Sequence, residues 1–565
     1  MGAGALAQGG HGVEPGVLAP VPAVDTGQRH AVVAHYHAHY RLPETALADP
    51  SFPWDGDVVD CEPGTTAHTH QRAVLQRINF FRTLAGLPGD VVLSPLKSEL
   101  SQAAALVMAA NGELSHTPSA DWRCYSPEAA QAAEMANLYL GIIGPQAIDG
   151  FVEDPGTFNG AVPHRRWLFY PPAREMGLGA VPPREDQWSA TALWVVDDSG
   201  VRASSGGNGG INPGEIPSSA VAWPPPGYVP VDFIYPRWSF ALPDADFSAA
   251  AVTVTQDGQP VDVVLEPVLD GIGDNTLVWI PDGDLPGVAD NDVVFQVTID
   301  GVVVGEQLER YRYEVVAIDP FRLEGEWVVE GPPPLDKGRP QNYSFAPLPG
   351  VERYEVRVAR RSPAGEVGWY GAPTTPRGYH HLTATDFAAL PTLEAVTTLV
   401  PRRHGRLEFR LWRRLMSTTT DLVLEVSTDD GHRWSLLWAA PGLSNRYESE
   451  GGFAPVVVSL ADYVDQPIQL RFRLVFEQRA YVGDRLDYGV LLDDLAVADV
   501  DALVVDQAFV VTEPAFAFTP TALDGYYLQV RPELGGHWFA FGPATVVQPV
   551  PNPTAEVSSP SVASP

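Results

Sequence analysis

Two short stretches decide the fold of the first third of the chain: Arg77-Ile78-Asn79-Phe80-Phe81-Arg82 and His164-Arg165-Arg166-Trp167. They lie near the two ends of the only segment with a helical pattern, residues 66–180. Hydrophobic side chains recur there at helical spacing, first at Val74, Leu75, Ile78 and Phe81. The sequence therefore predicts one helix-rich domain, which we place at residues 61–205.

Two further helices have clear start signals. Ser94-Pro95 and Ser126-Pro127 each place a serine N-cap before a proline at the first helical position. Gly112 and Gly141 are predicted to end these two helices, because glycine accepts the left-handed conformation of a helix C-terminus.

The rest of the chain has a β pattern. Residues 1–60 are proline-rich and are expected to be irregular, and a glycine-rich run at 206–210 separates the helical domain from the β-rich remainder. Short β-branched runs between turns then predict all-β sandwich domains. We expect one at 225–318, a second built from 319–395 plus 499–548, a third at 396–498 that is inserted in or packed beside the second, and a disordered tail at 549–565.

Composition limits the possible functions. The chain has 565 residues, with 70 acidic against 36 basic side chains and a formal charge of −34. This charge argues against nucleic-acid binding and against docking on anionic membranes through a basic patch. No run of about 18 apolar residues is present, so no transmembrane helix is expected.

The N-terminus holds a weak export signal. Ala5-Leu6-Ala7 has the small-x-small form of a signal-peptide cleavage site, but the preceding charged and apolar regions are missing. We interpret it as an incomplete signal peptide of a secreted, cell-surface or periplasmic protein. An ordinary alanine- and glycine-rich tail is the alternative.

The candidate site lies in the helical domain. His116 and His164 are its two histidines of interest, and Glu134, Glu153 and Asp154 lie between them in sequence. Two imidazoles with carboxylates can bind a divalent metal or act as general acid and base. Structural or surface histidines are the alternative, and neither a His-Glu-x-x-His nor a Gly-x-Ser-x-Gly motif is present.

The segment Ala73–Gly179 resembles a CAP domain, the superfamily of cysteine-rich secretory proteins, antigen 5 and pathogenesis-related proteins, and is most similar to its bacterial branch. The resemblance rests on the order and spacing of several short motifs: Arg77–Arg82, Ser115-His116-Thr117-Pro118, Ala136–Gly141, Ala147–Phe151, His164–Trp167 and Met176-Gly177-Leu178-Gly179. It implies an α-β-α sandwich with a central cleft.

The resemblance also implies a ligand set in that cleft. In the family, two histidines and two acids can hold a divalent ion, here zinc or magnesium, and His116 and His164 match the histidine positions. Ala136 stands where the family has a glutamate. Glu134 precedes it by two residues, which on a helix is about 200° around the axis. The second acid is Glu153 or Asp154, so we expect a degraded constellation.

Other residues carry weaker signals. His35-Tyr36-His37-Ala38-His39 would place three histidines on one side of a strand, where they can ligate zinc, although a solvated segment is the alternative. Cys61 and Cys124, the only cysteines, are predicted to pair in an exported protein, with two free thiols as the alternative.

The β domains carry resemblances as well. Ser427–Trp434 and Tyr488–Leu495 resemble jelly-roll domains of secreted bacterial proteases and adhesins, and Asp429, Asp430, Asp493 and Asp494 are calcium candidates there. A plain hairpin turn and a strand end are the alternatives. Tyr235–Phe240 resembles an Ig-like module, with Trp238 and Trp279 predicted in its core.

Together these patterns predict a multidomain protein, an α-β-α sandwich followed by all-β sandwich domains. We expect an exported bacterial binding or adhesion protein without catalytic activity, whose partner is an extracellular protein, peptide, lipid or glycan. The alternative is a peptidase-like hydrolase, divalent-metal-dependent where the cleft holds an ion, with His116 or His164 as base or ligand and Glu153 as partner.

Overall fold

The computed structural model describes most of the chain. The described residues are 20–41, 54–184, 187–200, 214–282, 291–325, 327–332, 335–372, 374–375, 378–382, 392–414, 420–431, 433–443, 449–476, 489–523 and 525–550. The cleavage-site motif at 5–7, the glycine-rich run at 206–210 and the tail beyond 550 lie outside them. The protein is multidomain and mostly β, and it divides into two compact units, Met1–Arg322 and Leu323–Pro565.

The N-terminal segment departs from the irregular structure expected for residues 1–60. It forms helix α1 (Arg29–His35) followed by a π-helix, η1 (Tyr36–Arg41). Val32, Val33 and Tyr36 are buried at helical spacing. Tertiary packing of this apolar face accounts for a helix that the surrounding prolines did not suggest.

The helical domain is built on a four-stranded sheet in the order β1-β3-β4-β2. Its strands are β1 (Val92–Leu93), β2 (Ala136–Leu140), β3 (Glu175–Val181) and β4 (Ala190–Trp194), and only β1 and β3 pair in parallel. The accompanying helices are α3 (His68–Leu84), α4 (Pro95–Asn111), α5 (Pro127–Glu134), α6 (Pro145–Glu153) and α7 (Pro163–Leu168), with a 3-10 turn, η2, at Thr157–Asn159.

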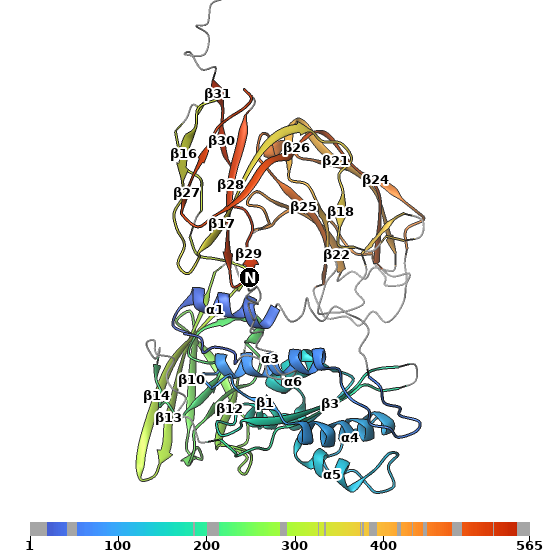
Figure 1. The fold of residues 1–565 in the computed structure, drawn as a ribbon, viewed down its shortest axis with the longest axis vertical. Helices are drawn as coiled ribbons and strands as arrows, with labels where there is room; N and C mark the ends of the chain where they lie inside the picture. Colours follow the sequence, from blue (N-terminus) through green and yellow to red (C-terminus); the bar gives the residue numbers. More distant parts are fainter. Residues whose placement is uncertain are drawn as a thin grey trace, which may run out of the picture. The chain divides into compact units, whose positions relative to one another are not determined.

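Helices lie on both sides of these strands. Figure 1 shows α3 and α6 on one side of β3 and α4 and α5 on the other. Helix α4 approaches β3 so closely that a Cβ on Gly177 or Gly179 would lie 2.3 or 2.2 Å from backbone atoms of Lys97 or Ser101. The two glycines of the Met176–Gly179 motif are therefore required by helix–sheet packing.

The predicted helix starts are confirmed, and one predicted stop is wrong. Helices α4 and α5 begin at Pro95 and Pro127, and the Ser126 hydroxyl accepts a hydrogen bond from the Ala129 amide at 3.0 Å. Gly112 ends α4 in the left-handed conformation, with φ 63°. Gly141 instead follows strand β2, because residues 136–140 pair with β4 rather than continue a helix.

The second part of the same unit is a ten-stranded sheet in the order β5-β14-β13-β10-β11-β12-β8-β6, with β7 on β14 and β9 on β13. Its strands are β5 (Gly214–Glu215), β6 (Val221–Trp223), β7 (Gly227–Pro230), β8 (Trp238–Ala241), β9 (Ala245–Asp246), β10 (Ala251–Gln256), β11 (Gln259–Leu265), β12 (Thr276–Asp282), β13 (Val293–Val304) and β14 (Gln307–Ile318), and a 3-10 turn, η3, spans Val231–Phe233. Trp238 and Trp279 are fully buried, which confirms them as core residues.

The second unit contains an eight-stranded sheet, β24-β21-β26-β17-β28-β29 with β19 on β26 and β30 on β28, and a five-stranded sheet, β18-β20-β25-β22-β23. The strands are β17 (Arg353–Pro363), β18 (Trp369–Tyr370), β19 (His380–Leu382), β20 (Thr392–Ala395), β21 (Leu399–Arg414), β22 (Thr420–Ser427), β23 (Ser435–Ala440), β24 (Ala454–Ser459), β25 (Gln469–Phe476), β26 (Gly489–Val511), β28 (Tyr526–Leu534), β29 (His537–Trp538) and β30 (Thr545–Val547). Two small pairs, β15 (Leu335–Asp336) with β31 (Pro549–Val550) and β16 (Gln341–Ser344) with β27 (Ala515–Phe518), and the 3-10 turn η4 (Ala461–Tyr463) complete it.

Two hydrophobic cores explain how this unit is divided. One joins residues 367–500, with Leu407, Leu424 and Phe472 from three different strands. The other draws on residues 327–358 and 516–547, so it combines segments on both sides of the first core. Strand β26, which is 23 residues long, contributes to both, because it pairs with β21 over one part and with β17 over another.

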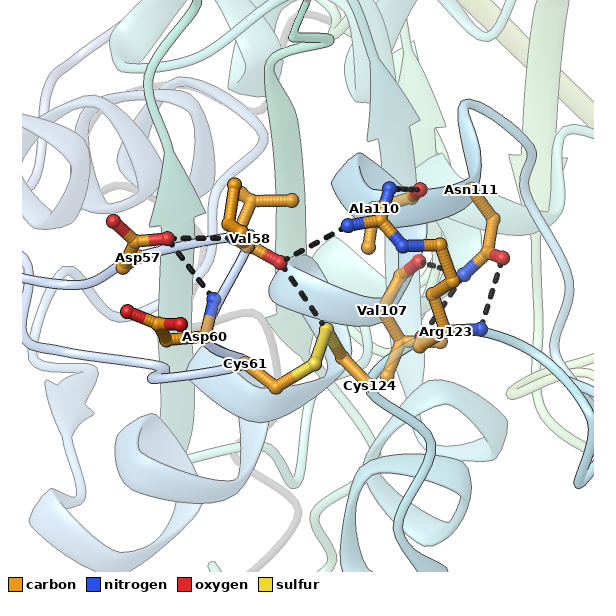
Figure 2. The surroundings of a disulfide bond; sticks show 10 residues. Asp57, Val58, Asp60, Cys61, Val107, Ala110, Asn111, Arg123 and Cys124 are labelled. Carbon is orange, nitrogen blue, oxygen red and sulfur yellow. Dashed lines mark hydrogen bonds between the residues drawn. A yellow bond between two sulfur atoms is a disulfide. The ribbon is translucent and has the colours of Figure 1, made fainter.

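A disulfide fixes the start of the helical domain. Cys61 and Cys124 are joined at an S–S distance of 2.11 Å across a sequence separation of 63 residues. Figure 2 shows the bond beside Asn111 and Arg123. The Asn111 side chain donates to the carbonyls of Val107 and Arg123 at 2.7 and 3.1 Å, which orders the loop that leads to Cys124.

We predict that loss of this disulfide lowers the free energy of unfolding of the first unit by about 4 kcal/mol, because the cross-link restricts a long loop in the unfolded chain. Denaturant unfolding of oxidised protein, reduced protein and the Cys61→Ser/Cys124→Ser variant measures this. Reductant added to the double variant is the control and should change nothing. Equal midpoints for oxidised and reduced protein would contradict the prediction.

Candidate functional site

One pocket brings together the two histidines that the sequence singled out. It has a volume of about 560 Å³ and opens between the loop after α4, strand β2 and the segment from α6 to α7. His116 and His164 both line it, although they lie far apart in the sequence. We call this cavity the imidazole pocket.

A buried carboxylate holds His164. One Asp154 oxygen lies 2.7 Å from His164 Nδ1, and the other accepts from the backbone amides of His164 and Arg165 at 2.9 and 3.3 Å. Asp154 is fully buried and sits in the left-handed conformation that ends α6, with φ 56°. The carboxylate therefore fixes both the start of α7 and the orientation of the ring.

His116 is oriented by a backbone carbonyl. Its Nδ1 lies 2.8 Å from the Ala133 oxygen. A carbonyl oxygen only accepts hydrogen bonds, so Nδ1 of His116 carries the proton. In His164, Nδ1 likewise donates to the Asp154 carboxylate. With Nδ1 carrying a proton, the Nε2 of each neutral imidazole has a lone pair that can accept a hydrogen bond or ligate a metal.

The walls of the imidazole pocket are largely apolar. Leu138 and Tyr139 come from β2, Phe151 from α6 and Phe158 from η2. The Phe151 ring stacks on His164, with centroids 5.5 Å apart, and the Phe158 side chain is fully exposed at the pocket. Burial, together with the charges of Glu153 and Asp154, raises the pKa of Tyr139.

Sequence reasoning missed these aromatic residues as site residues. Tyr139 and Phe151 lie inside motifs that carry the CAP resemblance, but an aromatic side chain in an apolar motif is most simply a core residue. Their position between the two histidines in the sequence was the available signal. Phe158 had no signal, because a single phenylalanine in a loop is common in proteins.

The other two predicted acids do not line the pocket. Glu134 is the exposed last residue of α5. Glu153 is half-buried at the end of α6, and its backbone carbonyl accepts from Arg165 at 3.1 Å. The assumption that Ala136 and Glu134 share a helix is wrong, because α5 ends at Glu134 and Ala136 begins β2.

The residues present do not complete a metal site by themselves. Catalytic zinc is held by three protein ligands, whereas the pocket supplies two imidazoles and an Asp154 carboxylate that already accepts three hydrogen bonds. No group of three or more histidine, cysteine or acidic side chains placed for an ion is found in the described part of the chain. The zinc or magnesium ion stays a prediction, and the function proposed below does not depend on it.

Two of the four calcium candidates in the second unit, Asp429 and Asp430, are engaged in hydrogen bonds within the protein. Asp429 accepts from the Ser427 hydroxyl at 2.8 Å and the Arg433 amide at 2.9 Å, as in a turn. Asp430 accepts from the Gln469 side chain at 2.8 Å and the Phe541 amide at 3.0 Å. Asp493 is half-buried and Asp494 is exposed on β26. Calcium at these residues also stays a prediction.

The three N-terminal histidines do not share one side of a strand, because they lie in α1 and η1. His35 Nε2 lies 2.9 Å from the Thr83 hydroxyl and its ring stacks on Phe80, while His37 Nε2 lies 2.9 Å from the Pro320 carbonyl. The His35 and His39 rings lie one helical turn apart, with centroids 4.9 Å apart, while His37 lies against Pro320 and Phe321. The three histidines therefore do not share one face, and the expectation of a strand that aligns all three is wrong.

Comparisons with known proteins identify no family. No family model matches the chain, and no curated protein matches its sequence.

Three solved structures show weak likeness. They are a carbohydrate-binding module from the β-sandwich superfamily, SGBP-B of the Bacteroides ovatus mixed-linkage glucan utilization locus in complex with a mixed-linkage heptasaccharide, and infectious bursal disease virus strain Gt. Identities are 11%, 10% and 11%, covering 46%, 47% and 55% of this chain and 91%, 69% and 70% of theirs, with TM-scores of 0.14, 0.09 and 0.12. TM-scores this low support no argument about fold or ligand. No helix among the described residues is long and apolar enough to cross a lipid bilayer.

We predict that Asp154→Asn lowers the free energy of unfolding by about 2 to 3 kcal/mol. The new amide would direct N–H groups at the ring or backbone donors that the carboxylate now satisfies. Denaturant unfolding measures the loss, and Asp198→Asn, at an exposed position of the same unit, is the matched control. A loss no larger than that of the control would contradict the buried pairing.

We also predict that acid weakens the first unit through its buried histidines. Burial lowers the pKa of His35 to about 3, with His39 adding to the shift, and burial lowers that of His70 to about 4. In the unfolded chain these histidines bind protons below about pH 6.5, whereas in the folded protein they stay neutral to a much lower pH. The free energy of unfolding therefore keeps its full value above about pH 6.5 and decreases as the pH falls below it. Lowering the pH from 7 to 5 should reduce the free energy of unfolding by about 2 kcal/mol for each of these two histidines.

Denaturant unfolding of the wild type, His35→Gln and exposed His68→Gln at both pH values checks this. The difference between pH 7 and pH 5 should shrink in His35→Gln and stay unchanged in the His68→Gln control. An unchanged difference in His35→Gln would show that His35 is not the responsible group.

Proposed function

We propose that the protein is an exported member of the CAP superfamily that binds a small amphipathic molecule in the imidazole pocket and does not turn it over. The β sandwiches would then serve recognition of an extracellular partner. The succession of helices and strands in the first domain, and the helices on both sides of its sheet, support the CAP resemblance.

The observation that carries the proposal is the chemistry of the pocket walls. Leu138, Phe151 and Phe158 suit an apolar body, and the volume of about 560 Å³ lies in the range of sites for small organic ligands. The two Nε2 lone pairs suit a head group that donates hydrogen bonds, such as a hydroxyl or an ammonium. The formal charge of −34 favours the ammonium over an anion.

The same residues argue for binding rather than turnover. Asp154 is committed to His164 and Arg165, and neither Glu134 nor Glu153 lines the pocket, so it lacks a second free acid or base beside the imidazoles among the residues described there. One observation favours the hydrolase alternative: the Asp154–His164 pair orients an imidazole as in known base catalysts.

We predict that the full chain binds monodansylcadaverine, an apolar ring system with a primary amine, with a blue-shifted rise in emission. Binding of dansyl-6-aminohexanoate, its carboxylate counterpart, should be at least roughly tenfold weaker. His116→Asn and His164→Asn keep an N–H near Nδ1 and lose the Nε2 lone pair, so each should weaken amine binding by roughly tenfold. Fluorescence titration gives the dissociation constants.

Leu308→Ala, at an exposed apolar position on β14, is the control and should bind like the wild type. Equal affinity for amine and carboxylate, or unaffected histidine variants, would refute the proposal. Hydrolysis of 4-nitrophenyl butyrate or labelled casein that both histidine variants abolish would replace it with the hydrolase function.

A further inference from the structure

A second pocket lies apart from the imidazole pocket, at another edge of the helical domain. It has a volume of about 690 Å³ and opens where the first turns of α3 meet α4 and the segment 63–66. Its floor is apolar, with Leu75 from α3, Leu93 from β1 and Leu178 from β3. Leu100 of α4 adds to this surface. Its size suits a short peptide or a comparable small molecule.

The walls are held in place by buried hydrogen bonds. The Thr66 hydroxyl donates to Gln102 Oε1 at 2.7 Å, and Gln102 in turn bonds to both the amide and the carbonyl of Ala180 at 3.0 Å. Gln71 Nε2 donates to the Thr66 carbonyl at 3.1 Å. Segment 63–66, helix α4 and strand β3 are thereby fixed relative to one another, so the pocket is preformed.

Charges of opposite sign stand on its two walls. Arg72 projects from α3, while Glu99 belongs to α4 and Glu128 to α5, and all three line the pocket and are exposed. None of them has a hydrogen-bond or ion-pair partner among the described residues. This contrasts with arginines such as Arg77 and Arg237, which pair with Asp149 and Glu266.

A sheet edge lies at the pocket floor. Strand β1 is the end strand of the four-stranded sheet and pairs only with β3 in the described structure. At Val91, just before β1, the Asn79 side chain satisfies both backbone groups, at 3.0 and 3.1 Å. One helical turn earlier, Leu75 faces the pocket beside Leu93. Because α3 covers the edge at Val91, this end of the pocket offers a ligand the Leu75 and Leu93 side chains.

From these observations we propose that this pocket binds a short apolar peptide with free termini. Its carboxylate would meet Arg72, its ammonium group would meet Glu99 and Glu128, and its side chains would cover the leucine floor beside β1. An opposite pair of charges on an apolar body is the chemistry that matches both walls at once. The inference is independent of the function proposed for the imidazole pocket.

Isothermal titration calorimetry of the full chain with the peptides Leu-Val-Leu and Leu-Val-Leu-Val-Leu tests the proposal. We expect at least one to bind with a dissociation constant below about 1 mM. Its N-acetylated and C-amidated forms should each bind roughly tenfold more weakly, because each block removes one terminal charge.

The variants assign each terminus to its wall. In Arg72→Gln the free and the amidated peptide should bind alike, and in Glu99→Gln/Glu128→Gln the free and the acetylated peptide should bind alike. Arg312→Gln and Glu306→Gln change the same charges at exposed positions elsewhere in the unit and should leave the preferences intact. These side chains are exposed, so the fold should tolerate every variant.

Absence of binding by both peptides would overturn the proposal, and so would equal affinity for free and blocked forms. The proposal would also be overturned if Arg72→Gln still bound the free peptide more tightly than its C-amidated form. Binding that survives in His116→Asn and His164→Asn separates this site from the imidazole pocket.

Discussion

The first unit depends on one buried guanidinium. Arg165 is almost fully buried, and its Nε donates to the Val152 carbonyl at 2.6 Å. Its other nitrogens donate to the carbonyls of Glu153 and Arg237, and to the Ser239 hydroxyl, at 2.8 to 3.1 Å. One side chain thus joins the end of α6, the start of α7 and strand β8. Removing this side chain would leave several buried acceptors without donors, which destabilises a protein far more than the loss of a hydrogen bond at the surface.

A second arginine, Arg237, links the imidazole pocket to the neighbouring ten-stranded sheet. Asp154 binds His164 through its carboxylate, and its backbone carbonyl accepts from Arg237 at 3.0 Å. Arg237 is paired with Glu266, close to β12. The position of the His164 ring is therefore set from two sides, by the helical domain and by the ten-stranded sheet. The helical domain and this sheet form one compact unit for a physical reason, since neither satisfies its buried polar groups alone.

Local chemistry explains which features could be predicted from the sequence. The helix starts at Ser94-Pro95 and Ser126-Pro127 depend on capping within one turn, and the burial of Trp238 and Trp279 depends on side-chain character. Strand β2 was missed because its alanine and leucine residues suit helices, and only pairing with β4 makes them extended. The N-terminal helical segment was missed for a similar reason, since α1 packs against β7 and the following η1 packs against α3.

The candidate site shows the same limit at the level of single residues. The types and order of His116 and His164 were enough to select them, but the role of Asp154 depends on a left-handed φ at the end of α6, which aims its carboxylate at the start of α7. Glu153 is adjacent in sequence and has the same charge, yet it does not line the pocket. Glu153 keeps the helical backbone of α6, whereas Asp154 leaves it with a left-handed φ, so composition selects the segment while backbone geometry selects the residue. An acid in this segment therefore acts on the pocket through the ring it orients, and the chemistry available to a ligand is that of two imidazoles in an apolar cavity.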